Sequence, residues 1–242
     1  MLKRIIDGRW LTASGVVGFY PANRVNDEDI EVYADETRSE MLFTYRNLRQ
    51  QGVKREGVSN KCLADYIAPR DSGLLDYIGM FAVTAGLGIE KKEAEFQAAL
   101  DDYSSIMLKS LADRLAEAFA ECMHARVRRD LWGYAADEAL SNDELIAEKY
   151  SGIRPAPGYP ACPEHVVKTD LFRVLDAADV GMELTDSYAM FPASSVSGFY
   201  FSHPESQYFN VGNIGADQLA DYVARSSRAE EDVRRTLAPN LG

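Results

Sequence analysis

The sequence lacks long apolar runs and contains few cysteines. No stretch approaches the roughly 18 apolar residues of a membrane span, and the first residues, MLKRIIDGRWLTASG, are too polar for a secretory signal. The three cysteines, Cys62, Cys122 and Cys162, are odd in number and widely spaced, which favours free thiols over a disulfide framework. We therefore expect a cytoplasmic protein that does not enter a membrane.

Basic residues are scarce relative to acidic ones. Lys and Arg total 26 against 38 Asp and Glu, which gives a net charge of −12. Nucleic acids and anionic membrane surfaces require a basic face, so both are disfavoured as partners. The only dense basic cluster, Arg126, Arg128 and Arg129, is interpreted as a cap at the C-terminus of a helix.

The common enzyme motifs are absent from the sequence. There is no GxGxxG, GxxxxGK[ST], GxSxG or HExxH, which removes the usual indications of Rossmann, P-loop, serine hydrolase or zincin chemistry. A zinc site could be drawn from Cys162 and His165 with Cys122 and His124. The two pairs fall in different predicted elements without structural-zinc spacing, so ordinary packing of the thiols is favoured and no metal is predicted.

What is present is a chain of 242 residues with average globular composition and no repeat or linker, which indicates one domain, residues 1–242. Segments rich in β-branched and aromatic residues predict strands, separated by turn-like sequences. These segments are 15–23, 29–35, 41–48, 63–69 and 75–86. From residue 90 to 131 there is no Gly or Pro, and apolar residues recur every three or four positions. This predicts a long amphipathic helix with a break near Ser104 and Ser105.

The second half of the chain mixes helices with irregular structure. Ser141 and Glu144 form a capping box that begins a short helix, and the loop at 152–163 holds four prolines. Helical spacing returns at 168–180, and the tail predicts two more helices between 215 and 239. Residues 196–212 are interpreted as a hairpin that turns at the segment containing His203. The fold class is therefore α+β: a mixed, mainly antiparallel central sheet flanked by long helices.

Three charged residues stand out as candidates for a binding site. Arg154 is the only basic side chain in the rigid proline loop, which suits a carboxylate ligand, although a salt bridge to a structural acid is equally consistent. Glu117 lies among small apolar residues of the long helix, and Glu148 lies just before the loop. Together they could hold a zwitterion with an extra positive centre, whereas each glutamate alone is typical of a solvated helix.

The loop at 154–165, RPAPGYPACPEH, closely resembles the R-x-x-x-G-Y-x-A-C-P signature of the S-adenosylmethionine-binding activation domain of cobalamin-dependent methionine synthase. The resemblance extends over nearly the whole chain. It also includes GVVGFYPANRV, DYIGMFAVTAG, LADRLAEAFAECMHARVRRDLWGYA, SYAMFPASSVSGFYFSHPESQYF and LAPNLG.

The resemblance implies a domain that binds S-adenosylmethionine and presents its methyl group to cobalamin held by another module. In this family the cofactor occasionally oxidises to inactive cob(II)alamin. An electron from a flavodoxin-type donor and the methyl of S-adenosylmethionine then restore methylcobalamin. The domain's part would be binding and orientation, so no catalytic side chain is expected within it.

The resemblance also assigns residues to the ligand. Arg154 corresponds to the clamp for the methionyl carboxylate, and Glu117 and Glu148 to the acids near the amino or sulfonium charge. Tyr159 and the loop backbone around Pro155, Ala161 and Cys162 correspond to the adenosyl side. Tyr208 and Phe209 occupy the place of an aromatic pair, in which Phe209 replaces a tyrosine and so lacks its hydroxyl.

The chain also departs from the family pattern, because a further amino-terminal helical stretch and the homocysteine, folate and cobalamin modules are missing from it. We therefore expect a domain truncated at its amino terminus that does not carry out the complete synthase reaction alone. A separately encoded reactivation subunit for a corrinoid protein and a ligand-free scaffold of the same fold are the alternatives. An autonomous small-molecule methyltransferase is disfavoured because the glycine-rich nucleotide loop is absent.

Overall fold

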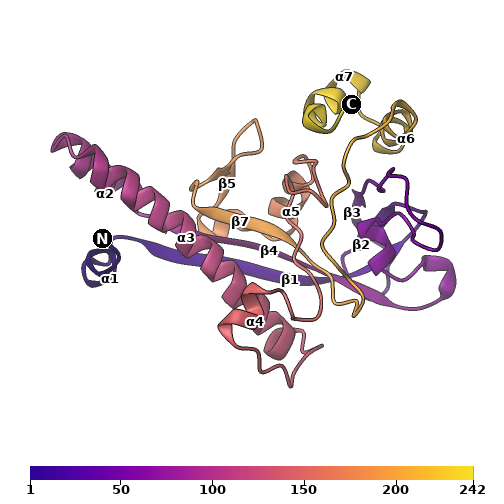
Figure 1. Ribbon diagram of the computed structural model, residues 1–242, viewed down its shortest axis with the longest axis horizontal. Helices are drawn as coiled ribbons and strands as arrows, with labels where there is room; N and C mark the ends of the chain where they lie inside the picture. Colours follow the sequence, from indigo (N-terminus) through magenta and orange to yellow (C-terminus); the bar gives the residue numbers. More distant parts are fainter. Residues whose placement is uncertain (242) are drawn as a thin grey trace.

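The computed structural model describes residues 1–241 and contains a five-stranded antiparallel sheet in the order β3-β2-β1-β4-β7 (Figure 1). Its strands are β1 (Thr12–Arg24), β2 (Asp29–Tyr33), β3 (Met41–Arg46), β4 (Asp76–Leu87) and β7 (Ser195–Tyr200). A separate two-stranded sheet pairs β5 (Glu183–Leu184) with β6 (Met190–Phe191). The predicted α+β class with a mainly antiparallel central sheet is confirmed.

Seven α-helices surround the sheet in residues 1–241. They are α1 (Leu2–Gly8), α2 (Ile89–Ala98), α3 (Asp102–Arg126), α4 (Asn142–Ile146), α5 (Lys168–Val174), α6 (Ala216–Ser226) and α7 (Glu230–Thr236). Short 3-10 helices cover Leu63–Tyr66, Arg70–Ser72, Ala177–Val180 and Ala238–Asn240, and a π-helical turn covers Val127–Leu131.

Both faces of the interior strand β4 are buried, as its continuous apolar sequence predicts. Ile78, Met80 and Ala82 face a core that includes Leu171 and Phe172 of α5. Phe81 and Val83 face the opposite core, against Ala120 of α3. The sheet therefore lies between α3 on one face and α5 on the other (Figure 1).

The long predicted helix is broken, but a few residues before the expected place. Leu100 adopts a left-handed backbone (φ 54°) between α2 and α3, and the Asp101 side chain caps α3 by accepting a 3.0 Å hydrogen bond from the backbone N–H of Ser104. Ser104 and Ser105 are therefore the first-turn residues of α3 rather than the break itself.

Arg126 lies in the last turn of α3, as the interpretation of the basic cluster expects, but Arg128 does not cap the helix, which corrects that interpretation at this residue. Its side chain is fully buried in the π-helical turn. Its guanidinium donates to both carboxylate oxygens of Glu138, with distances of 2.7 Å from Nη2 and 2.8 Å from Nε. A buried arginine needs such a bidentate partner, and the chain reversal after α3 supplies it.

Two predicted strand assignments were wrong. Residues 63–69 begin as a 3-10 helix in which Leu63 and Ala64 are fully buried, so their apolar character reflects burial in the core and not strand pairing. The predicted hairpin at 196–212 contains only β7, and the chain after it runs as an irregular segment to α6. His203 lies just before a turn at residues 204–205 in this segment.

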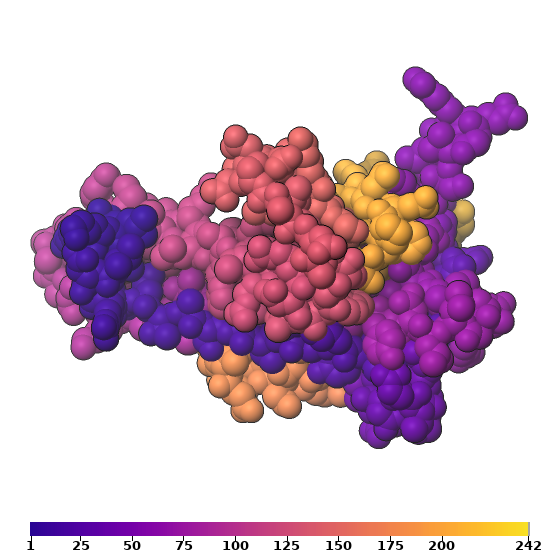
Figure 2. All heavy atoms as spheres, turned by 90° about the horizontal axis from the view of Figure 1, so that it is seen from below, coloured from indigo at the N-terminus to yellow at the C-terminus, as the bar shows by residue number. Residues whose placement is uncertain are grey.

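The remaining helix predictions are confirmed. Ser141 and Glu144 form the predicted capping box of α4, and the tail forms α6 and α7, which pack around a separate apolar cluster that includes Leu219, Tyr222 and Val233. The loop after β3, where Val53 is fully exposed, extends away from the body of the molecule (Figure 2). No helix within residues 1–241 is long and apolar enough to cross a membrane.

Candidate functional site

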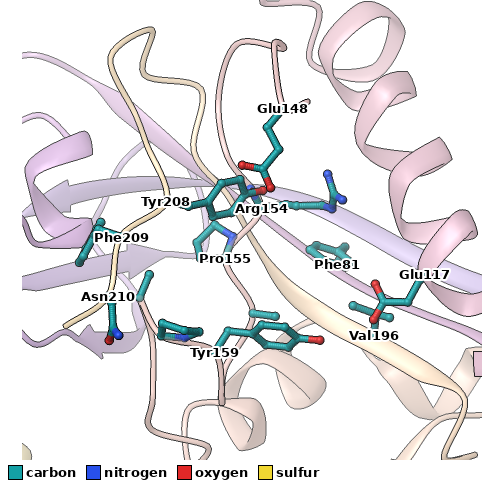
Figure 3. Close-up of a pocket in the computed structure, with 13 residues that line it drawn as sticks. Phe81, Glu117, Glu148, Arg154, Pro155, Tyr159, Val196, Tyr208, Phe209 and Asn210 are labelled. Atoms are coloured by element: carbon teal, nitrogen blue, oxygen red, sulfur yellow. The ribbon is translucent and has the colours of Figure 1, made fainter. Parts of the chain in front are cut away.

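A cavity of about 490 Å³ opens between α3, the proline loop and the segment that follows β7 (Figure 3). Charged, aromatic and small residues from these parts of the chain, together with one residue each from β4, β7 and the end of α4, line it. They are Phe81, Glu117, Glu148, Arg154, Pro155, Ala156, Tyr159, Pro160, Ala161, Val196, Tyr208, Phe209 and Asn210.

The proline loop is attached to the free edge of β7. Ile153 and Phe201 exchange two backbone hydrogen bonds of 3.0 Å, and the N–H of Phe199 donates to the carbonyl of Pro155 at 3.0 Å. Gly198 permits this approach, since a Cβ there would lie only 2.5 Å from the Pro155 oxygen. The loop therefore continues the sheet for a few residues and is held rigidly against it.

A tight turn at the far end of the loop presents Tyr159. The N–H of Gly158 donates to the carbonyl of Cys162 at 2.7 Å, and Gly158 itself has a positive φ of 98°. The turn leaves the Tyr159 ring exposed, with its hydroxyl pointing toward Glu117 (Figure 3). Partial burial and the Glu117 carboxylate raise the pKa of Tyr159, so it remains a neutral hydrogen-bonding group.

Glu117 and Glu148 approach the cavity from different elements. Glu117 projects from α3, and Glu148 follows α4 with a left-handed backbone (φ 53°) (Figure 3). Both side chains are exposed to solvent and both line the cavity. The two interpretations of the sequence, solvated helix residue and binding carboxylate, are therefore compatible at these positions.

Arg154 lies between the cavity and α3. Its Nη1 is 3.2 Å from Nδ1 of His124 and donates to the Tyr150 hydroxyl at 3.0 Å, while Nη2 forms an ion pair with Glu121. The salt bridge to a structural acid is thus present. Because arginine has five N–H donors, this pairing does not exclude a further carboxylate partner.

Two tyrosines connect the loop to the segment after β7. The Tyr208 hydroxyl accepts a 3.0 Å hydrogen bond from the backbone N–H of Arg154 and lies 3.3 Å from the Tyr150 hydroxyl. Burial is the main cause that raises the pKa of Tyr150, and the raised pKa keeps this hydroxyl protonated. Phe209 is half-buried and packs against apolar residues of both the main core and the C-terminal cluster.

Eight of the nine residues predicted from the sequence line this one cavity, and Cys162 does not. The Cys162 side chain is buried behind the loop, where its sulfur accepts a 2.9 Å hydrogen bond from the Tyr45 hydroxyl. Only the Cys162 backbone, through its bonds to Gly158 and Tyr159, shapes the loop.

Sequence reasoning missed Glu121, His124 and Tyr150, which surround the Arg154 guanidinium. Glu117, Glu121 and His124 are spaced i, i+4 and i+7, so they fall on one face of α3. This spacing could have indicated that Glu121 and His124 lie near the site, because they share the helix face of Glu117. Within residues 1–241, no group of three or more His, Cys, Asp or Glu side chains could hold a metal ion.

Comparison with known proteins identifies the family of this chain. A family described as "Vitamin B12 dependent methionine synthase, activation domain" matches residues 1–227. The chain belongs to this family. The activation domain is also similar to the crystal structure of the MetH reactivation domain bound to AdoHcy, which is S-adenosylhomocysteine. The two are 54% identical with a TM-score of 0.95, and the match covers 100% of this chain and 74% of the other.

The cavity of the activation domain combines opposite charges in a small volume. One arginine and two carboxylates meet there beside the aromatic rings of Tyr159 and Tyr208. A cavity of this size is in the range of small-molecule sites, roughly 300 to 1,000 Å³. Its chemistry suits a ligand that has both a carboxylate and positive centres, with an aromatic or apolar body.

Proposed function

We propose that the activation domain binds S-adenosylmethionine in this cavity and presents its methyl group for the reductive remethylation of cob(II)alamin, which reactivates methionine synthase. The observation that carries the proposal is the meeting of Arg154, Glu117 and Glu148 around one cavity. S-Adenosylmethionine carries one carboxylate, one ammonium and one sulfonium group, so each charge has a counterpart.

In this proposal Arg154 binds the methionyl carboxylate, and the two glutamates face the ammonium and sulfonium groups. The adenosyl group lies against the proline loop, formed by Pro155, Ala161 and the backbone of Cys162, with Tyr159 beside it. Tyr208 and Phe209 form the opposite wall. The location of Phe209 and Tyr208 across the cavity from Tyr159 supports this arrangement (Figure 3).

The domain's contribution is orientation. S-Adenosylmethionine supplies an electrophilic methyl group, and the protein holds it where the cobalt of a neighbouring module can accept it, leaving S-adenosylhomocysteine. The cobalamin-binding module of methionine synthase is the proposed partner, and a flavodoxin-type protein supplies the electron. The chain therefore acts as part of a methyltransferase and is not catalytically complete alone. A cytoplasmic location is proposed with it, supported by three cysteines that form no disulfide.

Calorimetric titration with S-adenosylhomocysteine and S-adenosylmethionine tests this function directly. We expect saturable binding of both, weakened in Arg154→Ala by about 1 to 3 kcal/mol, the cost of removing a charge-assisted partner. Arg235→Ala is the matched control because its side chain is exposed on α7, far in sequence from the cavity. It should bind both ligands as the wild type does.

Absence of binding by the folded wild-type chain would contradict the proposal and favour a scaffold that binds partners only. Equal binding by wild type and Arg154→Ala would instead remove Arg154 from the ligand contacts. A thermal melt of each protein establishes that the chains compared are folded.

A further inference from the structure

The Arg154 guanidinium is held by two residues of α3 that do not line the cavity. Glu121 pairs with Nη2, and Nδ1 of His124 lies 3.2 Å from Nη1. Both lie on the same helix as Glu117, one and two turns further along it. The helix that supplies a carboxylate to the cavity thus also supplies the groups that fix the arginine.

His124 can act only as an acceptor toward Arg154. Arginine has no acceptor atom, so Nδ1 of the imidazole accepts the hydrogen bond and the proton resides on Nε2, which lies 3.3 Å from the Tyr134 hydroxyl. The ring is fully buried. Its centroid lies 5.2 Å from that of the Tyr200 ring, which stacks on it, and 5.0 Å from that of the Tyr150 ring, which meets it edge to face. Its orientation and tautomer are therefore fixed.

The imidazole is also uncharged. Burial, followed by the cations Arg128 and Arg154, holds the pKa of His124 well below its ordinary value. A neutral acceptor orients the guanidinium without cancelling its positive charge. Glu121 offsets part of that charge from the helix side, and one of its oxygens, Oε1, is buried without a hydrogen-bond partner within residues 1–241.

The contacts made by Arg154 leave donors for a ligand. Nη1 uses two hydrogens, toward His124 and Tyr150, and Nη2 uses one, toward Glu121. Of the five N–H donors of an arginine, one on Nε and one on Nη2 remain without a partner among residues 1–241. Two donors on neighbouring nitrogens match the two oxygens of a carboxylate.

We propose that His124 and Glu121 are positioning residues that hold the Arg154 guanidinium in place for the carboxylate of the ligand before the ligand binds. The inference deepens the proposed function and rests on it. A free arginine side chain loses rotamer freedom when it binds, at about 0.5 to 1.5 kcal/mol for an immobilised side chain. Fixing the side chain in the folded protein transfers this cost from binding to folding.

The experiment compares two ligands and two substitutions at one position. S-Adenosylhomocysteine has the carboxylate that Arg154 would bind, and 5′-methylthioadenosine lacks it while sharing the adenosyl group. His124→Leu removes the acceptor. Asparagine has the same branched shape as leucine, so His124→Asn differs from His124→Leu mainly in retaining a carbonyl oxygen close to the position of Nδ1. Dissociation constants are measured by calorimetry, with thermal melts as a check on folding.

We expect His124→Leu to weaken S-adenosylhomocysteine binding about 2- to 13-fold, which is the cost of ordering Arg154 expressed as an affinity ratio. Binding of 5′-methylthioadenosine should stay within about 2-fold of wild type, the smallest change expected for one immobilised side chain. His124→Asn should recover most of the lost affinity. His203→Leu makes the same substitution outside the site and should leave both affinities unchanged.

Equal weakening of the two ligands, or equal weakening by Leu and Asn, would show a merely structural role for His124 and overturn the inference. Glu121→Gln keeps the shape of the side chain and gives a second test, in which S-adenosylhomocysteine alone should again bind more weakly. If Arg154→Ala weakens binding but neither the His124 nor the Glu121 variants do, only this inference fails. If wild type binds neither S-adenosyl compound, the proposed function fails first.

Discussion

The backbone N–H of Arg154 donates a 3.0 Å hydrogen bond to the hydroxyl of Tyr208. These residues are 54 positions apart, and the bond fixes the spacing between two walls of the cavity. The same hydroxyl lies 3.3 Å from that of Tyr150, which also accepts from the Arg154 guanidinium. Arg154 is thus held through its backbone as well as its side chain.

Tyr208→Phe should weaken S-adenosylhomocysteine binding about 5- to 10-fold, because one hydrogen bond is lost and the Arg154 N–H loses its acceptor. Calorimetric titration measures the change. Tyr103→Phe is the control, since Tyr103 is 73% exposed on α3 and removal of its hydroxyl should change nothing. An unchanged affinity in Tyr208→Phe would show that the bond does not maintain the cavity.

Glu138→Ala should destabilise the fold by about 3 to 5 kcal/mol, because Arg128 would remain buried with its charge uncompensated. Urea unfolding followed by circular dichroism gives the free energy of unfolding. The double variant Arg128→Met with Glu138→Leu should be more stable than Glu138→Ala, since no unpaired charge is left inside. If the double variant is the less stable of the two, packing of the arginine stem decides stability there.

Gly158→Ala should destabilise the protein more than Gly212→Ala. Both glycines have positive φ, 98° and 78°, which costs a side chain about 1 kcal/mol or more. A Cβ on Gly158 would also lie 2.1 Å from Cε1 of His165, whereas a Cβ on Gly212 would meet nothing within 4 Å. The clash should add about 1 to 3 kcal/mol in urea unfolding. Addition of His165→Ala should recover that part, and failure to do so would place the strain elsewhere.

Stability should decline in acid partly through His124. Its pKa is lowered in the folded protein by burial and by Arg128 and Arg154, so the unfolded chain takes up the proton first. The contribution of His124 to the free energy of unfolding is therefore fully present above the ordinary histidine pKa of 6.5. It is lost as the pH falls below that value, with a limiting slope of about 1.4 kcal/mol per pH unit. Burial lowers the pKa of His165 in the same direction.

The measurement is the free energy of unfolding of wild type and His124→Asn between about pH 7.5 and pH 5, a range of about 2.5 units that includes the ordinary histidine pKa. The variant should show a shallower decline, because it has no imidazole to protonate at this position. Parallel curves for the two proteins would show that His124 does not contribute to acid sensitivity.

Local sequence signals predicted much of this fold because the interactions they report are local. The Ser141 and Glu144 capping box is completed within one helical turn, and the β-branched and aromatic residues that predicted β1 and β4 lie within those strands themselves. The proline loop was predicted to be rigid because proline restricts its own backbone. None of these features depends on which distant segment packs against them.

The errors arose where distant contacts override local preference. Residues 63–69 have a strand-like composition, yet Leu63 and Ala64 are buried as a 3-10 helix because the core around them accepts that shape. The segment after β7 was predicted to pair as a hairpin, but the edge of β7 is occupied by Ile153 and Pro155 of the proline loop. A sequence pattern predicts that a segment is extended or buried, and it does not specify its partner.

The sequence by itself determined the family signature, the antiparallel α+β class and the residue types that meet a charged ligand, since these depend on composition, spacing and short-range capping. Only the tertiary structure decided that Arg154 pairs with Glu121 and His124, and that Cys162 turns away from the cavity toward Tyr45. Hydrogen bonds and ion pairs require atoms within about 3 to 4 Å, and folding alone brings residues 30 or more positions apart to that distance.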